Sequence, residues 1–132
     1  MRRRTRDALV EFLGGYDAVV EVGVGKRPDI ATALSDAGVA VTATDVRERP
    51  VPTRVEFVRD DVTEPRLAVY AEAEAVYGLN LPAELQSPTV AVAERVDAAC
   101  HFTTLGAEHP AVPARAATVP GETVFTAQPE PT

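Results

Sequence analysis

The sequence predicts an α/β protein: a three-layer αβα sandwich around a mainly parallel sheet of five or six strands. Two observations predict this class. Short runs rich in valine alternate with stretches of helical periodicity over residues 1–104, and this alternation is typical of parallel sheets covered by helices. No internal repeat of a solenoid period is present. The chain has 132 residues, of which 45% are hydrophobic and 25% charged, enough to bury one independent core.

The first half of this domain is predicted to hold three strands and two helices. An apolar face over residues 9–13 predicts a first helix that has Thr5 as its N-cap and ends at Gly14. A second helix begins with Pro28 at its first position and ends before Gly38. The predicted strands of this half span residues 18–22, 39–44 and 55–58.

The second half continues the alternation and then changes character. Thr63 is expected to cap a short helix that ends near Ala71, and a longer helix over 82–96 is expected to bend or break near Pro88. The predicted strands of this half span residues 75–79 and 98–103. Residues 105–132 are predicted to form a proline-rich tail outside the domain of residues 1–104. One edge strand over 122–127 and loosely held last residues are expected there.

The composition excludes several classes of protein. A net charge of −7 disfavours non-specific binding to nucleic acid or anionic lipid. Arginines follow the first methionine, but Asp7 and Glu11 interrupt the apolar stretch that an export signal needs. No apolar run approaches the length of a membrane span. We therefore expect a soluble, cytoplasmic protein, and the low-lysine, acid-rich composition suggests a halophilic source, although a GC-rich genome would also favour arginine.

The cysteine content limits the chemistry further. Cys100 is the only cysteine, so an intramolecular disulfide and a multi-cysteine zinc site are both excluded. No metal site is expected. Whether the chain associates with a protein partner or with a second copy of itself is left open by the sequence.

The most informative segment is the junction of the first strand and the second helix. The strand runs through Glu21 into Gly23 and Gly25, and a helix follows at once. Glycine allows a sharp turn close to a ligand, and the free N–H groups of a helix start suit anionic or polar ligand atoms. A dinucleotide fingerprint would need a third glycine where this chain has Pro28, so NAD or FAD is disfavoured.

The segment Glu21-Val22-Gly23-Val24-Gly25 resembles the first motif of class I S-adenosylmethionine-dependent methyltransferases, which have a Rossmann-like fold. In that family the glycine loop faces the methionine part of the cofactor. The resemblance implies that Asp45, at the end of the second strand, binds the ribose hydroxyls. It also implies that Asp61, after the third strand, lies beside the adenine amine, although the neighbouring Asp60 offers the same chemistry. Such carboxylates accept hydrogen bonds from hydroxyl and amine donors.

The chain departs from this family at several positions. Arg27 replaces a third motif glycine, and the segment Asn80-Leu81-Pro82-Ala83 keeps only Asn80 of an amine-methylating motif. Asn80 is a candidate for accepting a hydrogen bond from a substrate amine, although a turn asparagine before a helix is the structural alternative. The whole chain most resembles an uncharacterised family of small archaeal proteins, shortened relatives of these methyltransferases.

Two functions follow from the resemblance, and the sequence does not choose between them. The first is binding of S-adenosylmethionine or S-adenosylhomocysteine, with a small methyltransferase of unknown acceptor as the activity. The second is a non-catalytic binding or regulatory module that kept the Rossmann-like scaffold. Function belongs to the site and not to the fold, so the geometry of these residues must decide.

Overall fold

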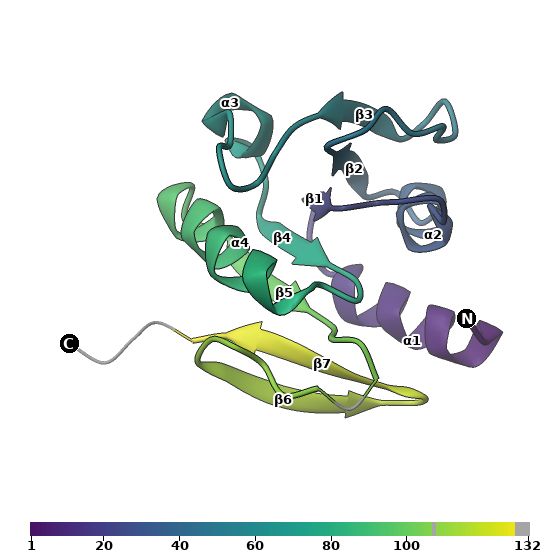
Figure 1. Ribbon diagram of the computed structural model, residues 1–132. Helices are drawn as coiled ribbons and strands as arrows, with labels where there is room; N and C mark the ends of the chain where they lie inside the picture. The colour runs from purple at the N-terminus through teal and green to yellow at the C-terminus, as the bar shows by residue number, and fades with distance from the viewer. Residues whose placement is uncertain (107, 129–132) are drawn as a thin grey trace.

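A computed structural model describes residues 1–106 and 108–128 of the chain and contains one seven-stranded sheet. The strands follow the order β3-β2-β1-β4-β5-β7-β6 across the sheet (Figure 1). They are β1 (Ala18–Val22), β2 (Ala40–Asp45), β3 (Glu56–Arg59), β4 (Ala75–Gly78), β5 (Ala99–Phe102), β6 (Ala114–Val119) and β7 (Glu122–Ala127). Strands β1 to β5 are parallel, and β7 runs antiparallel to both of its neighbours.

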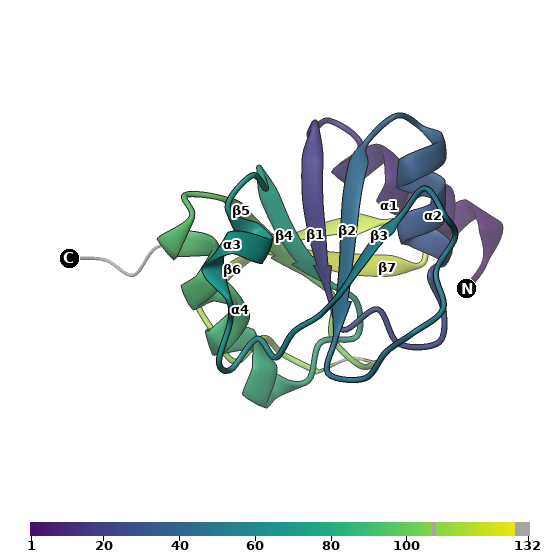
Figure 2. The same cartoon turned by 90° about the horizontal axis from the view of Figure 1, so that it is seen from above.

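Within the described residues, four helices cover the sheet and complete the three predicted layers. They are α1 (Arg3–Leu13), α2 (Asp29–Asp36), α3 (Leu67–Tyr70) and α4 (Ala83–Arg95). Helices α1 and α2 lie on one face, and α3 and α4 lie on the other (Figures 1 and 2). Each face has its own apolar core: Leu9 and Leu34 belong to the first cluster, and Tyr70 and Val92 belong to the second. The predicted fold class is therefore confirmed.

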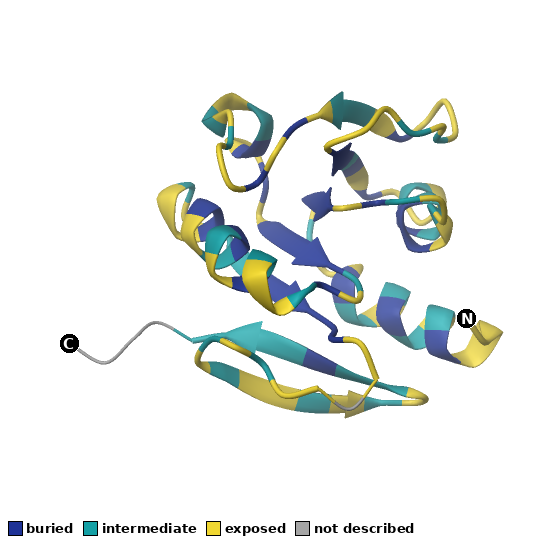
Figure 3. Cartoon of the chain, in the orientation of Figure 1, coloured by how far each residue is buried: buried dark blue, intermediate teal, exposed yellow. Residues whose placement is uncertain are grey.

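The sheet is larger than the five or six strands that we predicted. The segment Ala114–Val119 is a strand as well, and it pairs with the expected strand Glu122–Ala127 in a hairpin at one end of the sheet. Only a two-residue turn of Pro120 and Gly121 joins the two strands, with Gly121 at φ 79°. The segment Ala114–Val119 is rich in alanine and lies at the edge of the sheet, where its residues are exposed or half-buried (Figure 3). It therefore has little of the apolar pattern that predicts a strand.

Thr5 is not the N-cap of the first helix, contrary to the prediction. Helix α1 begins at Arg3 with Arg2 at the N-cap, so Thr5 lies inside the first turn, and it is buried. It packs against Gly121, where a Cβ atom would come within 2.2 Å of the Thr5 Oγ1. Tertiary packing, and not capping, therefore accounts for this threonine.

The other helices differ from expectation at their ends. Pro28 is the N-cap of α2 and not its first helical residue. Helix α3 is a single turn, and its N-cap is Arg66 and not Thr63. Helix α4 continues through Pro88 without a break. Proline inside a helix costs about 3 kcal/mol, and burial of Thr89, Val92 and Ala93 against the sheet offsets this cost.

The five predicted strands of the domain are present with shifts of one residue at some ends. The expectation of loosely held last residues concerns 129–132, which lie outside the described residues. Over the described chain, no helix combines the length and the apolar character needed to cross a bilayer.

Candidate functional site

The candidate site lies where the strand order reverses. From β1 the chain goes outward to β2 and β3, and it then returns to β4 on the other side of β1. In open α/β sheets, the crevice outside the carboxyl ends of the two strands at such a reversal is the usual ligand site. A cavity of about 480 Å³ lies there. Its walls come from six places: the start of α1, the end of β1, the loop after β1, the start of α2, the loop after β4, and the turn of the hairpin with the start of β7.

Glu21 stands in the wall of this cavity. Its side chain is only 2% exposed, and its Oε1 accepts a hydrogen bond of 2.7 Å from the hydroxyl of Tyr77. Burial raises the pKa of the Glu21 carboxyl to about 7, although the bond from Tyr77 opposes the shift, and the nearby charge of Asp29 adds to it. Among the described residues, no arginine or lysine forms an ion pair with it. A buried carboxylate without a cation is suited to a ligand that brings a positive charge.

The two motif glycines make the sharp turn that the sequence predicted. Gly23 and Gly25 have φ values of 72° and 61°, which glycine adopts without strain. The N–H groups of Gly23 and Val24 donate to the carbonyl oxygen of Thr44 at the end of β2. Gly23 also lines the cavity, with open space where a Cβ atom would be. The turn from Gly23 to Gly25, called the glycine corner below, is therefore hydrogen-bonded to β2 and open towards the cavity at Gly23.

Asp45 holds this corner from the neighbouring strand. Its Oδ2 accepts a hydrogen bond of 2.9 Å from the N–H of Gly25, and its Oδ1 accepts one of 3.1 Å from the N–H of Arg47. The Arg49 Nε lies 3.5 Å from Oδ2 and has no hydrogen-bond partner among the described residues. Asp45 thus supports the loop, and the remaining lone pairs of its two oxygens are what it can offer to ligand hydroxyls.

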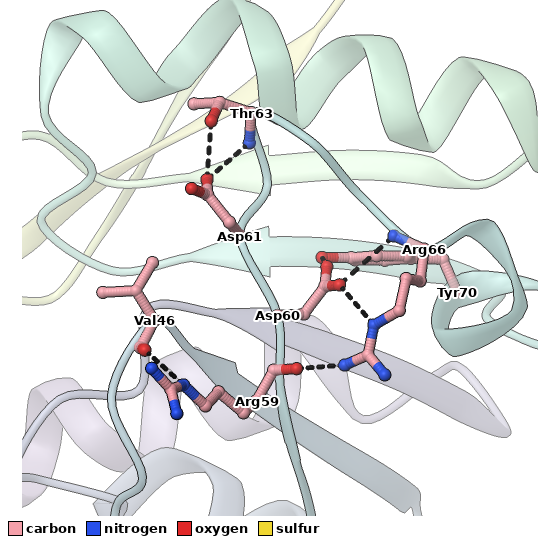
Figure 4. Close-up of polar contacts among 7 residues, drawn as sticks. All are labelled: Val46, Arg59, Asp60, Asp61, Thr63, Arg66 and Tyr70. Carbon is pink, nitrogen blue, oxygen red and sulfur yellow. Dashed lines mark hydrogen bonds and ion pairs between the residues drawn. The ribbon is translucent and has the colours of Figure 1, made fainter.

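Asp60 and Asp61 have different environments at the end of β3 (Figure 4). Asp60 is buried and accepts hydrogen bonds from the Tyr70 hydroxyl at 2.7 Å and from Arg66. Arg66 also donates to the carbonyl of Arg59. Asp60 therefore attaches α3 to the end of β3, and its carboxylate is used in hydrogen bonds within the fold.

Asp61 is exposed and accepts hydrogen bonds from the hydroxyl and the N–H of Thr63 through one oxygen, Oδ1. These bonds lower the pKa of its carboxyl. Both aspartates border a second cavity of about 470 Å³, which is separate from the one at Glu21 and is also lined by Val46. Of the two aspartates, Asp61 is the one with an exposed carboxylate.

Asn80 reaches the Glu21 cavity from the loop after β4. Its φ is 49°, a left-handed conformation that asparagine tolerates better than most residues. Its N–H donates to the Thr103 Oγ1 at 2.8 Å, and the residue is exposed at the cavity wall. The structure thus brings Glu21, Gly23 and Asn80 to one cavity and leaves Asp61 at the other.

Two further residues with reactive side chains belong to the interior. The His101 Nε2 lies 2.7 Å from the Tyr16 hydroxyl and its Nδ1 lies 2.9 Å from the Thr126 Oγ1, and burial lowers the pKa of the ring. Burial raises the pKa of the Cys100 thiol to about 12. Neither residue lines the Glu21 cavity. Within the described part of the chain, no cluster of three or more His, Cys, Asp and Glu residues is arranged to hold a metal ion.

Sequence reasoning missed three residues of the site, of which Arg2 and Arg27 line the cavity. Tyr77 lies in β4 and does not line the cavity, but its hydroxyl donates to the Glu21 carboxyl. Arg2 and Arg27 line the cavity from α1 and from the glycine loop. The sequence pointed in part to Arg27, because this residue stands where the methyltransferase motif has its third glycine. None existed for Arg2, which is brought there by the packing of α1 on the hairpin turn.

Solved structures of methyltransferases share this architecture. An RNA methyltransferase from Salinibacter ruber in complex with S-adenosyl-L-homocysteine aligns with a TM-score of 0.62 and 19% identity, over 96% of this chain and 91% of that one. A TehB-like S-adenosylmethionine-dependent methyltransferase from Corynebacterium glutamicum aligns with a TM-score of 0.64 and 15% identity, over 96% and 89% of the two chains. The fold is therefore a shortened methyltransferase-like fold.

Similar sequences come from archaea. A protein of Halobacterium salinarum is 54% identical over 105 residues, which are 80% of this chain and 81% of that protein. A protein of Archaeoglobus fulgidus is 45% identical over 82 residues, or 62% and 63% of the two chains. Both are described only as members of one uncharacterised family. Residues 8–129 match the model of that family, and the chain therefore belongs to the uncharacterised protein family UPF0146.

Proposed function

We propose that this protein binds S-adenosylmethionine or S-adenosylhomocysteine at the carboxyl ends of β1 and β2, and that it is a small methyltransferase. One observation carries the proposal: the buried carboxyl of Glu21 borders a cavity at the strand-order reversal, beside the open corner at Gly23. The amino-acid end of the cofactor carries an ammonium group. That group would supply the positive charge that Glu21 lacks within the protein.

The adenosine end would lie towards β2 and β3. Asp45 is buried and lines neither of the two cavities, and it holds the Gly25 and Arg47 amides, so its remaining lone pairs are what it would offer to ribose hydroxyls. Val46, the next residue, is 55% exposed and borders the cavity that Asp61 also lines. An exposed apolar side chain beside a free carboxylate oxygen is suited to a purine ring that carries an amino group. Under this proposal, Glu21 would hold the amino-acid end of the cofactor, and Asp45 and Asp61 would hold its adenosine end.

In methyl transfer, the residues of this chain would act by positioning the cofactor and the acceptor. A bound sulfonium cofactor would supply an activated methyl group. The lone pair of an acceptor would attack the methyl carbon in line, the bond between that carbon and sulfur would break, and S-adenosylhomocysteine would leave. The Glu21 cavity offers a place for the acceptor, and Asn80 stands at its wall. Holding two reactants close and aligned accounts for a large share of such rate enhancements without a general base. Binding without transfer would make the protein a non-catalytic module.

Isothermal titration with S-adenosylhomocysteine tests the binding site. We expect saturable binding by the natural protein and a loss of about tenfold or more in Glu21→Gln and in Asp45→Asn, because each change removes a charge-assisted contact. Glu94→Gln, an exposed change on α4, is the matched control and should bind as the natural protein does. Absence of heat at millimolar ligand would contradict the proposal, and so would equal binding by all the variants.

A further inference from the structure

Strand β6 forms one edge of the sheet, and its outer side is unpaired. It is the last strand in the order across the sheet and pairs with β7 alone (Figure 1). Among the described residues, no backbone group outside β7 forms a hydrogen bond with Ala114–Val119. None of the six residues of this strand is buried. The edge therefore presents free N–H and C=O groups to solvent.

The hydrogen bonds between β6 and β7 indicate which groups of β6 point outward. The Gln128 N–H donates to the Pro113 carbonyl oxygen at 2.9 Å, so the pair of residues just before the ladder is hydrogen-bonded. In an antiparallel ladder, bonded pairs alternate with non-bonded pairs. The odd-numbered residues of β6 are therefore bonded to β7. The outward N–H and C=O groups belong to the even-numbered residues Ala114, Ala116 and Thr118.

The opposite edge of the sheet is protected in a way that β6 is not. Strand β3 has four residues and a charged residue at each end, Glu56 and Arg59, and the Arg66 side chain donates to the carbonyl of Arg59. Short length and charge are ordinary means by which an edge strand avoids pairing. Strand β6 has six residues with Arg115 as its only charge, and its ladder with β7 contains no bulge. It therefore keeps a long and mostly uncharged edge.

The distribution of charge favours a second copy of the chain as the partner. Residues 109–128 contain one basic and one acidic side chain that are charged at pH 7, Arg115 and Glu122, so the net charge of −7 resides in the rest of the chain. Two molecules of this charge repel each other over most of their surfaces. At the β6 edge they can approach without this repulsion.

Strand β6 is also complementary to itself. When Ala116 of one copy faces Ala116 of the other across a two-fold axis, Ala114 faces Thr118. All the outward groups are then paired, and each pair exchanges both of its N–H···O=C bonds. In this register Arg115 lies opposite Ala117, so no like charges face each other.

The two neighbouring registers are less favourable. One places Arg115 against Arg115, and opposed like charges are destabilising. The other places Ala114 against Pro120, which has no N–H to donate. We propose that two copies of this chain associate by antiparallel pairing of their β6 edges about Ala116, so that their sheets become continuous. Pairing at this edge does not require a bound cofactor.

Disulfide cross-linking tests both the pairing and its register. The only native cysteine, Cys100, is buried. In the proposed register, the Cα atoms of the two copies of residue 116 lie about 5.5 Å apart, which a disulfide can bridge. The two copies of residue 118 are offset by about 13 Å along the strands, which is too far.

We expect Ala116→Cys to form a covalent dimer in oxidised glutathione. Thr118→Cys, the control on the same edge, should remain monomeric at the same protein concentration. Equal cross-linking of the two variants, or no cross-linking of Ala116→Cys, would overturn the proposal.

Sedimentation equilibrium measures the association of the natural protein. We expect a reversible dimer at protein concentrations up to about 1 mM, since one six-residue edge is smaller than a permanent interface. Salt of about 1 M should tighten the dimer, because it screens the repulsion between the two chains.

Two variants at the axis complete the test. Ala116→Pro removes the outward N–H and leaves the bonds to β7 in place, so it should weaken the dimer by about tenfold or more. Ala116→Ser keeps the N–H and should associate as the natural protein does. Equal association of both variants would overturn the proposal, and so would a monomer at every concentration, which would leave the edge to a foreign strand. If Ala116→Pro does not fold, the cross-linking pair decides.

Discussion

At the scale of single residues, Glu21 links the stability of the fold to the chemistry of the site. Its carboxyl is fully enclosed by protein on one side and borders the cavity on the other. Tyr77, on the adjacent strand β4, holds one oxygen in place. A position chosen for packing alone would be apolar, because burying a carboxylate without a cation is costly. The cost is explained if the site needs a negative charge for its ligand.

This cost predicts a pH dependence of stability. The pKa of Glu21 is about 7 in the folded protein against 4.5 when exposed, so the folded state binds the proton more tightly than the unfolded state. The unfolding free energy should therefore fall by about 3 kcal/mol as pH rises from about 4.5 to about 7, and then level off. Glu21→Gln should lack this component. Denaturant unfolding of both proteins across the pH range measures it, and parallel curves would show that the prediction is wrong.

At the scale of elements, the contact between α1 and the hairpin turn shapes one wall of the cavity. Gly121, in the turn between β6 and β7, lies against Thr5 in the first turn of α1. This contact joins the two ends of the described chain and brings Arg2 to the cavity. The element that sequence analysis treated as a tail is therefore part of the construction of the site.

Substituting Gly121 by alanine should separate these elements. The new Cβ would lie 2.2 Å from the Thr5 Oγ1, and the φ of 79° disfavours any side chain. We expect a loss of about 2 kcal/mol in unfolding free energy, measured by denaturant unfolding. Gly15→Ala is the control, since its Cβ would meet nothing within 4 Å. The double variant Thr5→Ala/Gly121→Ala should regain the part of the unfolding free energy that is lost to the steric clash, but not the part lost to the unfavourable φ. If Gly121→Ala were as stable as Gly15→Ala, the packing of Gly121 against Thr5 would be contradicted.

At the scale of the whole molecule, the hairpin completes the sheet and covers its core. Phe125 on β7 stacks on Phe102 on β5 with ring centroids 5.6 Å apart, and Val124 belongs to the core beside α1 and α2. Strand β7 contributes side chains to both apolar clusters, one on each face of the sheet. Its removal would leave β5 as an unprotected edge.

The predicted domain boundary can be tested by ending the chain at residue 104. Phe102 is 1% exposed in the complete fold and would lose its cover. We expect the shortened chain to lose about 3 kcal/mol or more of unfolding free energy and to bind hydrophobic dye. A chain ending at residue 128 is the control and should unfold like the full protein. Equal stability of the 104-residue chain would instead support the domain of residues 1–104.

The sequence by itself determined the class of the fold and the position of the glycine corner. Both depend on local signals: the alternation of strand and helix patterns, and the glycines between Glu21 and Pro28. Such signals are read along the chain, because backbone preferences depend on neighbouring residues. The turn conformation at Gly23 and Gly25 followed from these signals.

Only the tertiary structure decided which side chains share a cavity. It separated Asp60, committed to Tyr70, from the exposed Asp61, and it brought Arg2 and Arg27 to the rim of the Glu21 cavity. The physical reason is that these groupings arise from packing between distant segments, as at Thr5 and Gly121. Contacts between distant segments leave no periodic pattern in the sequence, so the charge of the site became visible only in the folded chain.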